Sequence, residues 1–188
     1  MTDMHNTTGA TPDYHRLMLE TGARARDAAR KLARAGTAAK NEALRTLAQS
    51  LREGREAVQR ANALDLDRAR AAQYKESFVD RLTVTDAVLE GMAQGCEQIA
   101  SLADPVGEIS DVHVQPSGIA VGRMRVPLGV VGIIYESRPN VTIDAAALTI
   151  KSGNAVILRG GSEAFETNRV LGEFVRRALA SAGLPADA

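Results

Sequence analysis

The sequence predicts an α/β fold in which a helical amino-terminal part leads into an incomplete parallel sheet. Three observations support this prediction: helical periodicity in the first part of the chain, an alternating hairpin pattern after it, and a strand–helix–strand–helix order at the end. We expect four segments, namely a flexible lead-in at 1–12, a helical part at 13–104, a hairpin at 105–126 and the first part of an α/β domain at 127–188.

The composition indicates a soluble globular protein. Of the 188 residues, 45% are hydrophobic and 24% are charged, which excludes a disordered tail. The 23 Lys and Arg residues balance 23 Asp and Glu residues, so no net charge attracts nucleic acid or an acidic membrane. The apolar run Val130–Tyr135 is too short to span a bilayer, and the polar stretch Met1–Pro12 is unlike a signal peptide. Because Cys96 is the single cysteine and no internal disulfide can form, we expect a cytoplasmic protein.

Helical periodicity dominates the segment 13–104. Apolar residues recur every three or four positions, and the Arg residues between them are expected on a solvated face. Thr37 is the predicted N-cap of one helix, and Thr83 followed by Asp86 resembles the capping box that starts a later one. The apolar face of this later helix comprises Val88, Met92, Cys96 and Ile99.

The pattern changes to β-structure after residue 104. Residues 112–126 alternate around Pro116-Ser117-Gly118, which predicts two strands joined by a turn. The continuous apolar run GVVGIIY follows Pro127 and is typical of a buried parallel strand.

A strand–helix–strand–helix order then predicts a parallel sheet with covering helices. The helix VTIDAAALTIKSG is closed by Gly153, NAVILR forms the second strand, and Gly160-Gly161 turns the chain into a helix that Gly183 stops. Two parallel strands leave open sheet edges, so we expect the sequence to stop before the sheet is complete.

Two strand ends carry the polar residues best suited to a ligand. Ligands of open α/β sheets bind where the strands end, because helix N-termini present free N–H groups there. The segments YESRPNVT and RGGSE lie at this edge and are predicted to face one ligand. Gly160 and Gly161 permit close backbone approach, Ser162 can cap the helix or donate its hydroxyl to a ribose or phosphate, and Arg159 suits a phosphate. An ordinary turn followed by an N-cap explains the same residues without a ligand.

The most specific motifs are VPLGVVGIIYESRPNVT and KSGNAVILRGGSEA, preceded by NALDL, DRLTVT, EGMAQG and DPVGEI. Together they cover nearly the whole chain and resemble the glutamyl phosphate reductases, a branch of the aldehyde dehydrogenase superfamily. The resemblance implies an aldehyde dehydrogenase-like fold and the NADPH-dependent reduction of L-glutamyl 5-phosphate to L-glutamate 5-semialdehyde and phosphate in proline biosynthesis. It also implies a homo-oligomer when the chain is complete, with the hairpin in the oligomerisation region.

The resemblance places NADPH at the second strand end. Residues 159–163 match the segment whose Lys and Glu contact the adenosine ribose in other aldehyde dehydrogenases. Arg159 takes the Lys position, Ser162 and Glu163 take the ribose-binding positions, and Gly160 and Gly161 lie between them. An uncharged Ser beside an Arg tolerates a 2′-phosphate better than a lone Glu does, which favours NADPH. No metal site is predicted.

The resemblance also supplies one catalytic and one substrate-binding candidate. Asn140 is the candidate for the Asn that hydrogen-bonds the thioester oxyanion, although the usual Trp-Asn spelling is replaced by ESRPN. Arg138 is the candidate contact for the acyl phosphate or the substrate carboxylate, and a Pro-stiffened turn with an Asn cap explains both residues without a function. The family's nucleophilic Cys follows the cofactor domain and is expected to be absent from this chain, because Cys96 precedes that domain on an apolar helix face.

Three functions stay open at this point. The first is a reductase whose catalytic domain is absent from the chain, so that the isolated chain does not turn over substrate. The second is a non-catalytic module that self-associates through its hairpin. The third is an inactive remnant whose open strand edges favour aggregation.

Overall fold

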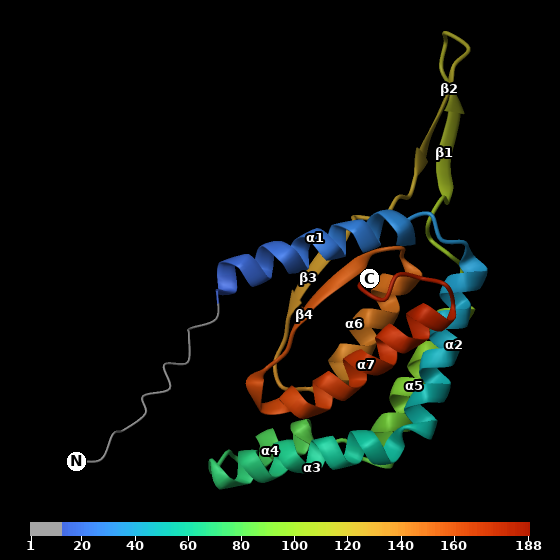
Figure 1. Ribbon diagram of the computed structural model, residues 1–188. Coiled ribbons are helices and arrows are strands. Elements are labelled where there is room, and N and C mark those ends of the chain that lie inside the picture. The colour runs from blue at the N-terminus through green and yellow to red at the C-terminus, as the bar shows by residue number, and fades with distance from the viewer. Residues whose placement is uncertain (1–12) are drawn as a thin grey trace.

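The computed structural model describes residues 13–188, so the predicted lead-in at 1–12 lies outside the described residues. The elements are α1 Tyr14–Leu32, α2 Thr37–Glu53, α3 Arg55–Ala71, α4 Glu76–Leu82, α5 Asp86–Ser101, β1 Ile109–Val114, β2 Ala120–Met124, β3 Val130–Ile134, α6 Pro139–Lys151, β4 Ala155–Arg159, the 3-10 turn η1 Ser162–Ala164, and α7 Phe165–Ser181 (Figure 1). Within this part of the chain, no helix combines the length and the apolar character that crossing a membrane requires.

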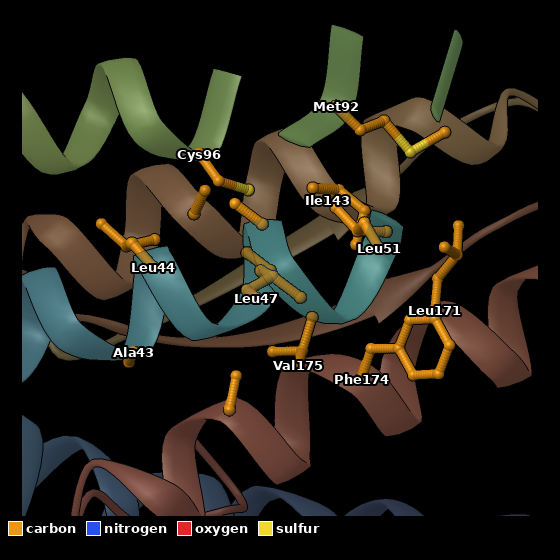
Figure 2. Packing of buried hydrophobic residues seen from close by; sticks show 14 of the residues in the cluster. Ala43, Leu44, Leu47, Leu51, Met92, Cys96, Ile143, Leu171, Phe174 and Val175 are labelled. Atoms are coloured by element: carbon orange, nitrogen blue, oxygen red, sulfur yellow. The ribbon is translucent and has the colours of Figure 1, made fainter. Parts of the chain in front are cut away.

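The main core lies between α2, α5, α6 and α7. In Figure 2, α2 runs through the middle, with side chains from α5 and α6 meeting it from one side and those of α7 from the other. Leu44, Leu47 and Leu51 of α2 are completely buried, and the three- and four-residue spacing of this apolar stripe agrees with the periodicity expected over 13–104. Burial of a Leu side chain contributes about 1.5–3 kcal/mol, so this stripe stabilises the whole helical part.

The start of α2 differs from the prediction. Gly36 occupies the N-cap position in an extended conformation, and Thr37 is the first helical residue. The Thr37 hydroxyl donates to Asp104 Oδ2 at 2.7 Å. The same Asp104 oxygen pairs with Lys40 Nζ at 2.5 Å, and the Lys40 side chain is only 1% exposed. The prediction of Thr37 as the N-cap is therefore wrong, because its hydroxyl binds the carboxylate of a buried ion pair instead of the helix end.

The start of α5 also differs by two residues from the prediction. Thr85, not Thr83, is the N-cap, and its Oγ1 accepts a hydrogen bond from Val88 N at 3.2 Å. Thr83 follows the end of α4, and its hydroxyl donates to Val79 O at 2.8 Å. The short helix α4 uses the first Thr, so only the second is available to α5.

The hairpin is confirmed and projects away from the rest of the molecule (Figure 1). β1 and β2 pair antiparallel, from Ile109 opposite Met124 to Val114 opposite Ala120, with an irregularity between Ser110 and His113. Every residue of both strands is exposed.

The predicted parallel pair is also confirmed. β3 and β4 are in parallel register from Val130 opposite Ala155 to Ile134 opposite Arg159. Helix α1 packs across these strands through Ala28 and Ala29, and α6 and α7 lie on the other side in Figure 1. The expectation of a buried strand is wrong for β3, because Ile134 is 83% exposed and no residue of β3 is fully buried. Among the described residues β3 has a single neighbouring strand, which leaves its other edge uncovered.

Candidate functional site

The two polar strand ends lie side by side at the carboxyl edge of the parallel pair. Just beyond β3, Tyr135 N donates to Arg159 O at 3.1 Å, which continues the pairing one residue past the end of β3. Two residues later, Ser137 Oγ donates to Glu163 Oε2 at 2.6 Å. YESRPNVT and RGGSE therefore meet at one edge, as the parallel arrangement predicts.

The Gly160-Gly161 turn is shaped by close packing against polar side chains. A Cβ on Gly160 would lie 2.5 Å from Asn168 Nδ2 and 3.0 Å from the Tyr135 ring. A Cβ on Gly161 would overlap the Ser137 hydroxyl and lie 2.7 Å from Glu163 Oε2. A side chain at either position would therefore displace these polar groups, whether or not a ligand also approaches the backbone.

A second group of hydrogen-bonded polar side chains lies next to this turn; two of them belong to the predicted segment YESRPNVT, and no sequence motif singled out the third, Asn168. Tyr135 Oη and Thr142 Oγ1 are 2.7 Å apart, and Thr142 Oγ1 donates to Asn168 Oδ1 at 2.9 Å. Burial of Tyr135 raises its phenol pKa, which keeps the hydroxyl protonated. These hydrogen bonds connect the residue after β3 with α6 and α7, and they hold the strand-end edge beside the turn.

A cavity of about 520 Å³ opens beside the turn, between α1, β4 and α7. Arg159, Gly160, Gly161 and Ser162 all line it, so the structure brings these four predicted cofactor residues together. Three further arginines line it, Arg24 of α1 and Arg169 and Arg176 of α7. Arg169 also pairs with Glu166 at 3.2 Å and Arg176 with Asp187 at 3.9 Å. Guanidinium groups suit phosphate because they are always charged and donate several hydrogen bonds in a plane.

Ser162 is not a helix cap, contrary to the expectation. It is the first residue of η1, and its side chain makes no capping hydrogen bond there. The free N–H groups at the start of α7 are instead satisfied by Asp65 of α3, which accepts from Glu166 N at 3.2 Å and from Thr167 N at 2.8 Å. Asp65 also accepts from Thr167 Oγ1 at 2.7 Å. A side chain from another helix thus performs the capping that the local sequence assigned to Ser162.

Glu163 lies behind the turn. Its Oε2 accepts from Ser137, and its Oε1 accepts from Tyr74 Oη at 3.3 Å. These hydrogen bonds, with that from Ser137 the largest cause, hold the pKa of Glu163 below its usual range. Tyr74 belongs to the connection between α3 and α4, so the helical part reaches the strand-end edge.

The two catalytic and substrate candidates lie at the start of α6. Asn140 is in the first turn of this helix, and its Nδ2 donates to Asp144 Oδ2 at 3.2 Å. Arg138 occupies the N-cap position without a capping side-chain bond, and its Nε pairs with Glu136 Oε1 at 2.8 Å. Asn140 is therefore not the helix cap, so capping does not explain why an Asn stands at this position.

Asn140 lines a cavity of about 460 Å³ together with Asp144 and Met92. This cavity is separate from the one beside the Gly160-Gly161 turn, so the structure does not place Asn140 with the predicted cofactor residues. Burial of the Asp144 carboxylate raises its pKa, even though the hydrogen bond from Asn140 acts in the opposite direction.

Cys96 is a core residue. It is 1% exposed among the side chains of α2 and α6, and burial, followed by the charges of Asp144 and Glu97, raises its thiol pKa to about 12. A thiol of this kind is not a nucleophile at neutral pH. Across residues 13–188, no group of His, Cys, Asp and Glu side chains gathers in a way that could hold a metal ion.

Comparison with solved structures shows the class of fold. No family model matches the chain. A propionaldehyde dehydrogenase from Clostridium phytofermentans matches 89% of this chain and 35% of its own, with a TM-score of 0.58 at 16% identity, which shows similarity of fold alone. The described residues therefore have an aldehyde dehydrogenase-like α/β fold, as the motifs predict.

Within this class, two structures are much more similar. The gamma-glutamyl phosphate reductase of Thermotoga maritima is 42% identical with a TM-score of 0.87, over 90% of this chain and 41% of that one. The gamma-glutamyl phosphate reductase of Saccharomyces cerevisiae is 31% identical with a TM-score of 0.85, over 89% of this chain and 44% of that one. The chain is thus related to the gamma-glutamyl phosphate reductases and spans less than half of their length, which confirms the resemblance of its motifs.

Proposed function

We propose that this chain provides the NADPH-binding edge of a glutamyl phosphate reductase. The complete enzyme would reduce L-glutamyl 5-phosphate to L-glutamate 5-semialdehyde and phosphate in proline biosynthesis, in the cytoplasm. The observation that carries the proposal is the Gly160-Gly161 turn, which ends a parallel strand and opens with Ser162 and Arg159 onto one cavity. The strong similarity to two reductases supports the choice of reaction.

The residues at this edge suggest how the dinucleotide is held. The turn backbone allows close approach, and the guanidinium of Arg159 is suited to the 2′-phosphate that distinguishes NADPH from NADH. Bound NADPH supplies the hydride of the reaction. Residues 127–188 form part of the cofactor domain in this proposal, after a helical part at 13–104 and an oligomerisation hairpin at 105–126.

Asn140 and Arg138 are proposed for the substrate side. Asn140 has a second amide hydrogen besides the one directed at Asp144, and this hydrogen is available to an oxyanion. Arg138 is an exposed cation that can exchange Glu136 for the acyl phosphate or the carboxylate of L-glutamyl 5-phosphate. The reaction also needs a reactive Cys, and buried Cys96 does not fill that role. We therefore expect no substrate turnover by residues 1–188 alone.

Titration with nucleotides tests the cofactor edge. NADPH and its fragment 2′,5′-ADP are added to the ¹⁵N-labelled chain, and the backbone signals of residues 159–163 are followed. We expect saturable shifts there, stronger for NADPH than for NADH, that Arg159→Gln weakens. Arg60→Gln, at an exposed position of α3, is the matched control. Equal affinity for NADH and NADPH, or shifts confined to other parts of the chain, would contradict the proposal.

Self-association is the second candidate function. It is favoured by the hairpin, whose apolar side chains are exposed on a segment that projects from the molecule. The largest of them are Ile109, Val112, Val114, Val121 and Met124. Sedimentation of the wild-type chain and of Val112→Lys tests this function: a dimer that the substitution dissociates supports it, and a wild-type monomer contradicts it.

A further inference from the structure

The carboxylate of Glu163 is held by the protein itself. Ser137 donates to one of its oxygens at 2.6 Å and Tyr74 donates to the other at 3.3 Å. The Tyr74 ring is in turn stacked on Phe78, with ring centroids 4.6 Å apart. Three segments distant in sequence therefore meet at this one side chain.

The carboxylate and the cavity lie on different sides of the turn. Gly160, Gly161 and Ser162 line the cavity of about 520 Å³, and Glu163 is not among its lining residues. The side of Gly161 on which a Cβ would stand instead faces the Ser137 hydroxyl and Glu163 Oε2. The turn thus wraps around the Ser137–Glu163 hydrogen bond and presents its other face to the cavity.

Ser162 has the opposite placement. Ser162 is exposed and lines the cavity. It caps neither η1 nor α7, because the N–H groups at the start of α7 are bound by Asp65. A hydroxyl both donates and accepts, so it can pair with a ribose hydroxyl or a phosphate oxygen.

The hydrogen bonds of Glu163 leave its carboxylate engaged by the protein instead of by a ligand. An ionised carboxylate only accepts hydrogen bonds, and both of its oxygens already have O–H donors from the protein. The pKa of Glu163 is lowered chiefly by the hydrogen bond from Ser137, so the group is charged at neutral pH and the hydrogen bond is charge-assisted. If Glu163 bound a ribose hydroxyl in place of Ser137 and Tyr74, the turn would lose the hydrogen bonds that hold it in the conformation lining the cavity.

We propose that Glu163 is a positioning residue, which holds the Gly160–Ser162 turn through Ser137 and Tyr74, and that Ser162 and the turn N–H groups contact the nucleotide. This inference rests on the proposed function, because it assigns roles within the same cofactor edge. It separates the two adjacent polar residues at the ribose-binding positions into one that faces the ligand and one that supports the turn.

The test compares variants of the ¹⁵N-labelled chain with 2′,5′-ADP as the probe. Glu163→Gln keeps an acceptor for Ser137, so its dissociation constant should stay within about threefold of wild type. Glu163→Ala and Ser137→Ala should each weaken binding by about tenfold, and the double variant should be no weaker than Glu163→Ala alone. Ser162→Ala should weaken binding without moving the Gly160 and Gly161 signals of the ligand-free chain. Glu173→Ala, an exposed position of α7, is the control.

The outcomes separate this inference from the proposed function. Binding by Glu163→Gln as weak as by Glu163→Ala, with Ser137→Ala unaffected, would mean that Glu163 contacts the ligand directly, and would overturn the inference. The positioning role is also decided without ligand: Glu163→Ala and Ser137→Ala must displace the Gly160 and Gly161 signals, and Glu163→Gln must not. If 2′,5′-ADP causes no saturable shift of the backbone signals of the wild-type chain, the proposed function is contradicted. The comparison of the ligand-free variants would still test whether Glu163 holds the turn.

Discussion

Asp65 of α3 accepts hydrogen bonds from both the backbone N–H and the hydroxyl of Thr167, at 2.8 and 2.7 Å, although the two residues are 102 positions apart in the sequence. This contact fixes the start of α7, and with it the turn that lines the candidate cofactor cavity. The Asp65 side chain is 1% exposed, so water cannot replace the hydrogen bonds that it makes. The helical part therefore positions the strand-end edge directly.

Asp65→Ala should lower the free energy of unfolding by about 2–3 kcal/mol, because it leaves the N–H groups at the start of α7 without a partner in a buried place. Denaturant unfolding followed by circular dichroism measures the change. Asp67→Ala, on the exposed side of the same helix, should change stability by less than about 0.5 kcal/mol. Similar losses in both variants would contradict the capping role of Asp65.

Asp104 should make stability sensitive to acid. Burial raises its pKa, but hydrogen bonds from Lys40, Thr37 and the N–H of Val106 outweigh that effect and lower the pKa below the ordinary value of 3.8. A carboxyl group whose pKa is lower in the folded state stabilises the folded protein at pH values above its unfolded-state pKa. This contribution is lost as the pH falls through the folded-state pKa. The free energy of unfolding should therefore decrease below about pH 4, the ordinary range of an Asp.

The matching variant is Asp104→Asn, which leaves the ammonium of Lys40 buried without its carboxylate. We expect a loss of about 3 kcal/mol at pH 7 and a weaker dependence on pH below 4. Asp80→Asn, an exposed position of α4, is the control. A pH profile of Asp104→Asn that parallels the wild type would show that another group causes the acid sensitivity.

Cys96 should be unreactive until the chain unfolds. Its thiol pKa of about 12 leaves almost no thiolate at pH 8, and its 1% exposure blocks reagents. Alkylation by iodoacetamide, followed by mass spectrometry, should proceed only in denaturant. Cys96→Ser should cost about 1–3 kcal/mol because it buries a hydroxyl, and Cys96→Ala less. Rapid modification of the native chain would contradict the placement of this residue in the core.

Asp144→Asn should raise stability at neutral pH. Burial raises the pKa of Asp144 above its ordinary value of 3.8, so the ionised form is disfavoured in the folded state. The cost of ionising Asp144 in the folded protein is absent below its unfolded-state pKa, and it appears as the pH rises through the folded-state pKa. Asn retains an acceptor for Asn140. The gain should stay below about 0.5 kcal/mol, because the carboxylate is only partly desolvated and the residue as a whole is exposed. Thermal unfolding should show a gain at pH 7 that vanishes near pH 3.5, and a loss at pH 7 would contradict it.

Most of the elements could be predicted from the sequence because their patterns are local, whereas the short helix α4 was missed because seven residues carry too little periodicity. The stripe of Leu44, Leu47 and Leu51 and the continuous apolar run of β3 are each visible within a few turns or residues. The meeting of the two strand ends follows from parallel pairing, which places carboxyl ends at one edge. Four of the five predicted cofactor residues accordingly line one cavity.

What could not be predicted depends on contacts between distant segments. Ser162 has the local pattern of a cap, and only the three-dimensional position of Asp65 shows that the cap comes from another helix. Tyr74 lies in the connection between α3 and α4 and Arg24 in α1, and neither segment has a motif for a cofactor. Tyr74 nevertheless donates a hydrogen bond to Glu163, and Arg24 lines the cavity. Side chains of this kind are recruited by packing, and packing has no signature within a short window of sequence.

The central position of α2 has a consequence for the order of events during synthesis. Lys40 donates a hydrogen bond to the carbonyl of Lys151, which follows it by 111 residues. At the usual elongation rates a ribosome needs on the order of 5–20 s to add that length of chain. In this interval the nascent α2 can pair with α5 but still exposes the face that later meets α6 and α7. The time for which this apolar surface stays open to misassociation is therefore set by translation speed, and slower synthesis should lengthen it.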